Sequence, residues 1–214
     1  MTDPRGEGAL AMSSAALDAR SLRVDTPSGP ASVSLSRRGN SGLYVVGHGA
    51  GGGIDAVDLV AVSTALVGSG WTVARVLQPY RVKGRRAPEA PPRLDAAWIA
   101  VLDALRKERT GRLVVSGRSS GARVAVRTAT EVGADAVVAL AFPLHPPGKP
   151  EKSRAEELVG LRAPHLVVQG ERDAFGTASE FPAGANVVSV PGDHSLKQST
   201  SAVAAAVLGW LSGQ

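Results

Sequence analysis

The stretch from residue 112 to residue 130 constrains the fold of this chain more than any other. It begins with the apolar run Leu113-Val114-Val115, continues with Gly-Arg-Ser-Ser-Gly at 117–121, and has a helical pattern from there to Thr130. A strand that turns directly into a helix in this way places one side chain, Ser119, at the apex of a sharp turn. Glycines suit the positions two before and two after it, because side chains there would collide with the neighbouring strand and helix.

This pattern is typical of a nucleophile elbow, in which the serine hydroxyl stands above the edge of the sheet. The first amides of the following helix lack intrahelical partners, so they would face negative charge that develops beside Ser119. The same five residues also occur by chance in loops that do no chemistry. A base and an orienting acid elsewhere in the chain are therefore needed to decide between the two interpretations.

Both partners follow Ser119 in the chain order expected of such an elbow, each in a loop after a predicted strand. Asp173 follows the strand that ends at Gln169, and His194 follows the strand that ends at Val190. The carboxyl ends of parallel strands meet at one edge of a sheet, so the three loops can converge. We predict Ser119, Asp173 and His194 as the catalytic residues.

Two other acids, Glu171 and Asp193, are close enough to these loops to be alternatives to Asp173. Glu171 sits immediately after its strand and is expected to point away, and Asp193 is too close in sequence to His194 to support it. Asp173 is therefore favoured as the orienting acid.

The segment His48-Gly-Ala-Gly-Gly-Gly53 follows another short apolar strand. Consecutive glycines allow backbone amides to approach an oxyanion closely, and the predicted donors are Ala50 or Gly51 together with Ser120. A phosphate-cradling loop is the alternative, but neither Gly-x-x-x-x-Gly-Lys-Ser/Thr nor a correctly placed Gly-x-Gly-x-x-Gly is present. His48 is expected to brace this loop rather than to act as the base.

Apolar runs and helical segments alternate along most of the chain, which predicts an α/β fold with a mostly parallel central sheet flanked by helices. Residues 21–36 read as a hairpin that adds antiparallel strands. Residues 1–20 are expected to form a disordered arm, and 21–214 a single domain. The expected strands are 21–25, 31–36, 43–46, 71–77, 112–116, 136–142, 165–169 and 186–190, and the expected helices are 56–66, 93–108, 122–130, 151–161 and 202–211.

Composition excludes several classes of protein. The chain has no cysteine and four scattered histidines, so a structural metal site is not expected. No apolar run reaches the roughly 18 residues of a membrane span, and no signal peptide is evident, so a cytoplasmic protein is expected. The net charge is +5, but the only basic cluster, Arg81–Arg86, is interpreted as a solvated loop rather than a nucleic-acid surface. Whether the chain is a monomer or a homodimer stays open.

Several segments together resemble the small, uncapped, dienelactone-hydrolase-like branch of the α/β-hydrolases, in particular the testis-expressed protein 30 type family. The matching segments are HGAGGG (48–53), GRSSGAR (117–123), FPLHPPGKPEKSR (142–154), VVQGERDAFGT (167–177) and DHS (193–195). The proline-rich segment is the most discriminating, because it is not general to the superfamily. Ser120 and Ala174 depart from the family pattern, where methionine and proline are expected.

This resemblance implies an α/β-hydrolase fold with about eight strands and a minimal cap, the same three catalytic residues and no cofactor. The short segment 143–161 then implies a shallow, open pocket for a small-molecule acyl substrate. Arg118, His145 and Lys149 are candidates for binding an anionic substrate, and Arg123 is as well explained by a structural salt bridge.

Two functions follow from these patterns. The first is a serine hydrolase that cleaves an ester, lactone or thioester. The alternative is a catalytically silent α/β-hydrolase-fold interaction module, because a fold does not fix a function.

Overall fold

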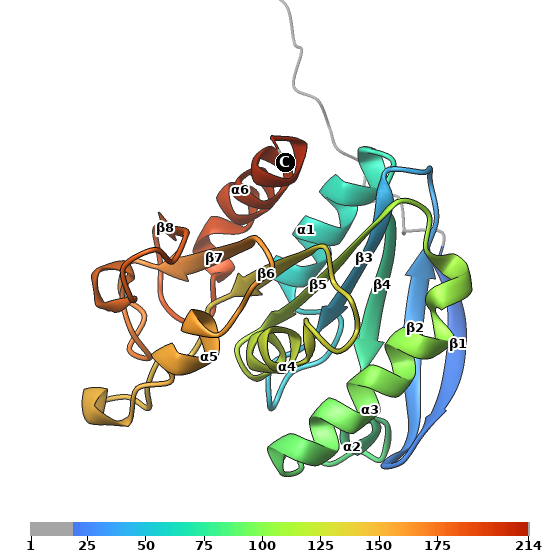
Figure 1. Cartoon of the computed structure of the whole chain (residues 1–214), viewed down its shortest axis with the longest axis horizontal. Coiled ribbons are helices and arrows are strands. Elements are labelled where there is room, and N and C mark those ends of the chain that lie inside the picture. The colour runs from blue at the N-terminus through green and yellow to red at the C-terminus, as the bar shows by residue number, and fades with distance from the viewer. Residues whose placement is uncertain (1–18, 214) are drawn as a thin grey trace, which may run out of the picture.

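The structure is a computed structural model, and it describes residues 19–213. One eight-stranded sheet runs through the domain in the order β1-β2-β4-β3-β5-β6-β7-β8 (Figure 1). β1 pairs antiparallel with β2, and β2 with β4, whereas the other neighbours are parallel. The strands are β1 (Ala19–Thr26), β2 (Gly29–Ser36), β3 (Gly42–Gly47), β4 (Thr72–Leu77), β5 (Arg112–Arg118), β6 (Ala136–Leu140), β7 (His165–Gly170) and β8 (Val187–Val190).

Helices cover both faces of this sheet. α1 and α6 pack together on one face, and α3, α4 and α5 lie on the other (Figure 1). The helices are α1 (Val57–Gly68), α2 (Pro79–Val82), α3 (Pro91–Ala104), α4 (Ser120–Thr128), α5 (Ala155–Val159) and α6 (Thr200–Ser212), and 3₁₀ turns occur at η1 (Arg106–Glu108), η2 (Pro150–Lys152), η3 (Ala178–Glu180) and η4 (Lys197–Ser199). This is the α/β-hydrolase fold that the sequence predicts.

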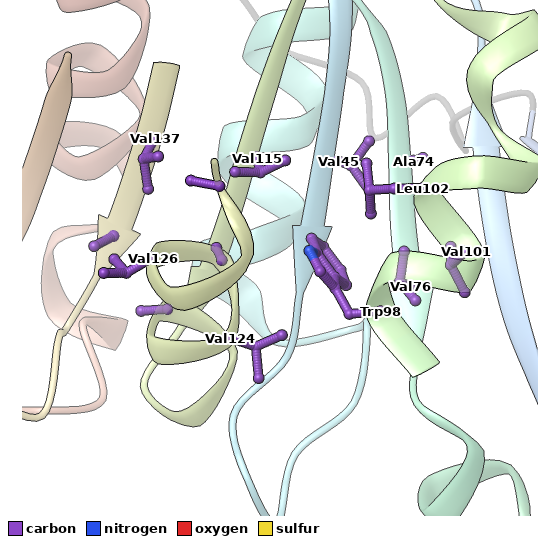
Figure 2. Packing of buried hydrophobic residues seen from close by; sticks show 14 of the residues in the cluster. Val45, Ala74, Val76, Trp98, Val101, Leu102, Val115, Val124, Val126 and Val137 are labelled. Carbon is purple, nitrogen blue, oxygen red and sulfur yellow. The ribbon is translucent and has the colours of Figure 1, made fainter. Parts of the chain in front are cut away.

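The apolar strands contribute to two core layers. In β3, Leu43 and Val45 face one layer, whereas Tyr44 and Val46 face the other, and all four are buried. Burial on both faces explains why such strands read as continuous apolar runs rather than alternating ones. Figure 2 shows Trp98 of α3 near the carboxyl end of β3, in the layer it shares with Val124 of α4.

The structure corrects several expected boundaries. Between the strand expected at 71–77 and the helix expected at 93–108 lies α2, and α3 begins at Pro91 because proline is tolerated in the first helical turn. α4 begins at Ser120 rather than 122. β6 ends at Leu140, since Ala141 has a φ of 47°, which an extended strand does not allow.

The expected disordered arm, residues 1–20, lies almost wholly outside the described residues, and its last two members belong to β1. Between β6 and β7 the chain inserts only η2 and the five-residue α5, so the minimal cap is confirmed. Within 19–213, every helix is too short or too polar to cross a membrane.

Candidate active site

The elbow joins β5 to α4 through one residue with an unusual backbone conformation. Ser119 has φ 52° and ψ −113°, a combination that costs a non-glycine residue about 1–3 kcal/mol. Its amide donates to the Leu140 carbonyl at 2.9 Å, which anchors the apex to the end of β6. A Cβ built at Gly117 would lie 2.2 Å from the Gly121 carbonyl carbon, so the turn has no room for a side chain there.

The three loops predicted to converge do so at the carboxyl edge of the sheet. Ser119 Oγ lies 2.8 Å from His194 Nε2, and His194 Nδ1 lies 2.8 Å from Asp173 Oδ2. The Asp173 side chain is fully buried, whereas the His194 side chain is 21% exposed. This arrangement links the Ser119 hydroxyl, through the half-buried imidazole, to a buried carboxylate.

The two other acids in these loops, Glu171 and Asp193, are not the partner of the His194 ring. Glu171 is exposed, and Asp193 accepts a hydrogen bond from the Ser195 amide at 2.8 Å. The geometry therefore favours Asp173 as the partner of the histidine.

Two residues that the sequence analysis did not single out support this pair. The Gln169 side-chain amide donates to Asp173 Oδ2 at 2.8 Å, and the Phe175 amide donates to Oδ1 at 2.8 Å. The Phe175 ring lies with its centroid 4.2 Å from that of His194. One signal was available, because Gln169 is a polar residue that closes the apolar run of β7.

His48 braces the glycine-rich loop, as expected. Its Nε2 accepts a hydrogen bond from the Gln78 amide at 3.1 Å, and its Nδ1 lies 2.8 Å from the Gly49 carbonyl. Because Nε2 is an acceptor, the proton of the neutral ring is assigned to Nδ1. Burial lowers the pKa of His48, which favours this neutral form.

The same loop passes directly beside the elbow. A Cβ built at Gly49 would lie 3.6 Å from Ser119 Cβ, and the Tyr80 hydroxyl donates to the Ala50 carbonyl at 2.7 Å. Ala50 is half-buried and Gly51 is exposed. Of the glycines in this loop, Gly49 is the one at which a built Cβ comes within 4 Å of Ser119. The sequence analysis did not propose Gly49. Ser120 is the first residue of α4, where an amide has no intrahelical partner.

A cavity of about 10 Å³ lies beside the Ser120 end of α4, between the glycine-rich loop, α3 and α4. Its lining is partly apolar and includes His48, Gln78, Tyr80, Leu94, Trp98 and Val124. A cavity of this volume holds about one water molecule.

The three residues predicted to bind an anionic substrate differ in whether their positive charge is already paired within the protein. Arg118 is engaged by Asp58 and by the His194 carbonyl. His145 lies 2.9 Å from the Pro146 carbonyl and 3.0 Å from Glu180, and these contacts raise its pKa, the carbonyl most strongly. Lys149 is exposed. Of the three, Lys149 alone keeps its charge uncompensated among the described residues.

Arg123 forms the structural salt bridge that was one of its two expected roles. It pairs with Glu157 of α5, and Arg127, one turn further along α4, pairs with Asp95 of α3 at 2.6 Å. Both arginines therefore hold helices together. Throughout residues 19–213, no three histidine, aspartate or glutamate side chains gather as metal ligands would.

Comparison with known proteins assigns the family. The model described as alpha/beta hydrolase domain matches residues 40–206, and the chain belongs to this family. In a search of curated proteins, no sequence matches this chain. The narrower resemblance to the testis-expressed protein 30 type family stays a prediction.

Solved structures share the fold at low sequence identity. A lidless α/β serine hydrolase from Xanthomonas campestris is 22% identical, with a TM-score of 0.69 over 90% of this chain and 94% of that one. A Pyrococcus furiosus esterase is 16% identical, with a TM-score of 0.77 over 98% and 96%. An α/β serine hydrolase homologue from Coxiella burnetii is 16% identical, with a TM-score of 0.75 over 90% and 97%.

Proposed function

We propose that this protein is a serine hydrolase that cleaves a carboxylic ester, lactone or thioester through an acyl-enzyme on Ser119. The observation that carries the proposal is the hydrogen-bonded series Asp173–His194–Ser119, with both distances at 2.8 Å. A hydroxyl, an imidazole and a buried carboxylate in this order are what nucleophilic acyl transfer requires.

Each residue has a defined part in the reaction. Ser119 Oγ attacks the acyl carbon while its proton moves to His194 Nε2, and the Asp173 carboxylate stabilises the imidazolium through Nδ1–H. His194 then gives the proton to the leaving oxygen or sulfur, and the acyl group remains on Ser119. Water attacks this intermediate with His194 again as the base, which releases the acid and restores the serine.

The negative charge on the former carbonyl oxygen needs donors that are already in place. The Ser120 amide, at the start of α4, and an amide of Ala50 or Gly51 are the proposed donors. The Tyr80 and His48 contacts support this assignment, because they hold the Ala50 and Gly49 carbonyls and so fix the loop beside the elbow.

The short insertion between β6 and β7 leaves the site open to solvent. The cavity beside Ser120 has room for about one water molecule, so neither the acyl group nor the leaving group of a substrate is enclosed. Arg118 and Arg123 are ion-paired, so any preference for anionic substrates would depend on Lys149 and on Lys197 near His194. We expect that preference to be weak and to disappear at high salt.

The rival function is a silent interaction module with this fold. A strained serine conformation and a complete set of three catalytic groups speak against it, since neither helps a scaffold to bind a partner. The deciding test is hydrolysis of p-nitrophenyl acetate by the wild type, Ser119→Ala and the control Ser201→Ala, which alters an exposed serine on α6. We expect activity in the wild type and control alone. Equal activity in all three proteins would reject the proposal.

A further inference from the structure

Arg118 is the last residue of β5 and directly precedes the nucleophile, and its three guanidinium nitrogens face three different elements. Nη2 donates to the His194 carbonyl at 2.9 Å, and Nε lies 3.2 Å from Asp58 Oδ2. Nη1 lies beside the glycine-rich loop, where a Cβ built at Gly49 would be only 2.9 Å from it. One side chain thus joins the histidine loop, helix α1 and the oxyanion loop.

Asp58 is the fixed end of this connection. It lies in the first turn of α1, and its side chain is 1% exposed. Burial raises the pKa of Asp58, while the Arg118 charge opposes the rise, and the start of the helix also favours a carboxylate. Arg118 Nε and Asp58 Oδ2 are within ion-pair distance, but neither atom makes a hydrogen bond. The attraction between them is therefore electrostatic, and a buried carboxylate that lost this cation would be left uncompensated.

The contact with the His194 carbonyl acts on the backbone that carries the imidazole. Both ring nitrogens of His194 are already engaged, one by Ser119 and the other by Asp173. The two contacts can form together only when the imidazole ring is correctly placed between these residues. The Arg118 guanidinium holds that backbone from the end of β5, and Asp58 of α1 holds the guanidinium. The planar guanidinium of arginine can contact a carboxylate and a carbonyl at the same time. The single ammonium group of lysine, on a flexible side chain, does this poorly.

We propose that Asp58 and Arg118 form a positioning pair that holds the His194 loop in register with Ser119 and the oxyanion loop. The proposal rests on the proposed function, and it replaces the substrate-binding role predicted for Arg118. Neither residue touches the reacting atoms. The pair acts by keeping His194 Nε2 within hydrogen-bond reach of the nucleophile.

A positioning role predicts a specific kinetic pattern. A displacement of about 1 Å in a catalytic group costs up to roughly 100-fold in rate, whereas binding of a small neutral ester is hardly affected. Loss of the pair should therefore lower kcat and leave KM nearly unchanged. A substrate anchor would instead raise KM, and only for substrates that carry a negative charge.

The experiment compares wild type, Asp58→Asn, Arg118→Lys and the double variant on a matched pair of neutral and carboxylated p-nitrophenyl esters. The control is Arg127→Lys, which alters another part-buried arginine–aspartate pair, the one that joins α4 to Asp95 of α3. Circular dichroism and thermal unfolding establish that each protein is folded. Ser119→Ala measures the background.

We expect each single variant to lose about 10- to 100-fold in kcat on both esters, with the double variant no worse than the poorer single one, because both act through one contact. Arg127→Lys should match the wild type. Three results would each overturn the positioning role. The first is a wild-type kcat in the folded variants, and the second is a change in KM for the carboxylated ester alone. The third is failure of both single variants to fold. Wild-type activity equal to that of Ser119→Ala would instead reject the proposed function.

Discussion

The side-chain nitrogen of Gln169 lies 2.8 Å from Oδ2 of Asp173, the same oxygen that faces the His194 ring. The amide also donates to the Gly176 carbonyl at 2.8 Å and lies 3.3 Å from the Phe142 carbonyl. Gln169 is completely buried. It therefore ties the carboxylate to the loop that follows β7 and holds it at the angle that the imidazole needs.

Replacing Gln169 by leucine should weaken both catalysis and folding. A hydrogen bond to a charged group contributes about 1.5–3 kcal/mol, which corresponds to a loss of roughly 10- to 100-fold in kcat/KM. The Gly176 carbonyl, which would be left without a donor, should lower the free energy of unfolding by about 1–3 kcal/mol, whereas the Phe142 carbonyl keeps its bond from the Leu144 amide. Ester hydrolysis and urea unfolding measure the two effects, with the exposed Gln198→Leu as the control. Unchanged kinetics in Gln169→Leu would remove this residue from the support of the site.

The acid itself is tested by comparing Asp173→Asn with Glu171→Gln. Asparagine keeps the shape but cannot stabilise the imidazolium, so kcat should fall by about 10³- to 10⁴-fold. Glu171 is exposed, so its variant should keep most of the wild-type rate. Losses of similar size in the two variants would mean that the acid has been assigned wrongly.

The elbow glycines can be tested against a glycine that has space around it. Gly117→Ala places a methyl group 2.2 Å from the Gly121 carbonyl carbon, and we expect it to destabilise the fold by about 1–3 kcal/mol or more. Gly209→Ala, on α6 with no atom within 4 Å of the added carbon, should stabilise the protein by about 0.5–1 kcal/mol. Urea unfolding compares them. A neutral Gly117→Ala would show that the turn is looser than described.

The pH dependence of stability should reflect His48. Its folded pKa lies below the ordinary 6.5, so the unfolded chain takes up a proton first as the pH falls. Stability is therefore unaffected by His48 above its unfolded pKa and decreases as the pH falls from about 6.5 toward the folded pKa. A proton on Nε2 would also oppose the Gln78 amide donor. Urea unfolding at pH 7.5 and 5.5 should show a smaller acid loss in His48→Asn than in the wild type.

His145 supplies the opposite sign for comparison. Its pKa is raised, so it contributes stability below its unfolded pKa that is lost as the pH rises through the folded pKa. His145→Gln should therefore make the acid loss steeper than in the wild type. An equal acid loss in wild type, His48→Asn and His145→Gln would contradict both assignments.

Much of this architecture could be predicted from local patterns. The alternation of apolar strands and helices gave the order of the elements, and the turn at Ser119 followed from glycines only a few residues apart. Asp173 and His194 could be predicted because chain order places both in loops after parallel strands. The start of α3 was missed because Pro91 and Pro92 also suit a loop.

The support of the site could not be predicted in the same way. Arg118 and Asp58 are 60 residues apart, and nothing near either residue indicates that α1 packs beside the elbow. The sequence predicts Arg118 as a substrate contact because it is the neighbour of Ser119, whereas its contact with Asp58 supports the positioning role that we propose. Pairings of this kind depend on how helices pack on the sheet, and packing is set by the whole core rather than by a short segment.

The most direct test of the catalytic assignment is labelling with a fluorophosphonate, which reacts covalently with an activated serine and needs no knowledge of the substrate. Intact-protein and peptide mass spectrometry should find one adduct per chain, on Ser119. The adduct should be absent in Ser119→Ala and form far more slowly in His194→Gln, because the base no longer activates the hydroxyl. A wild-type protein that stays unlabelled, or that labels equally fast without His194, would contradict the proposed hydrolase.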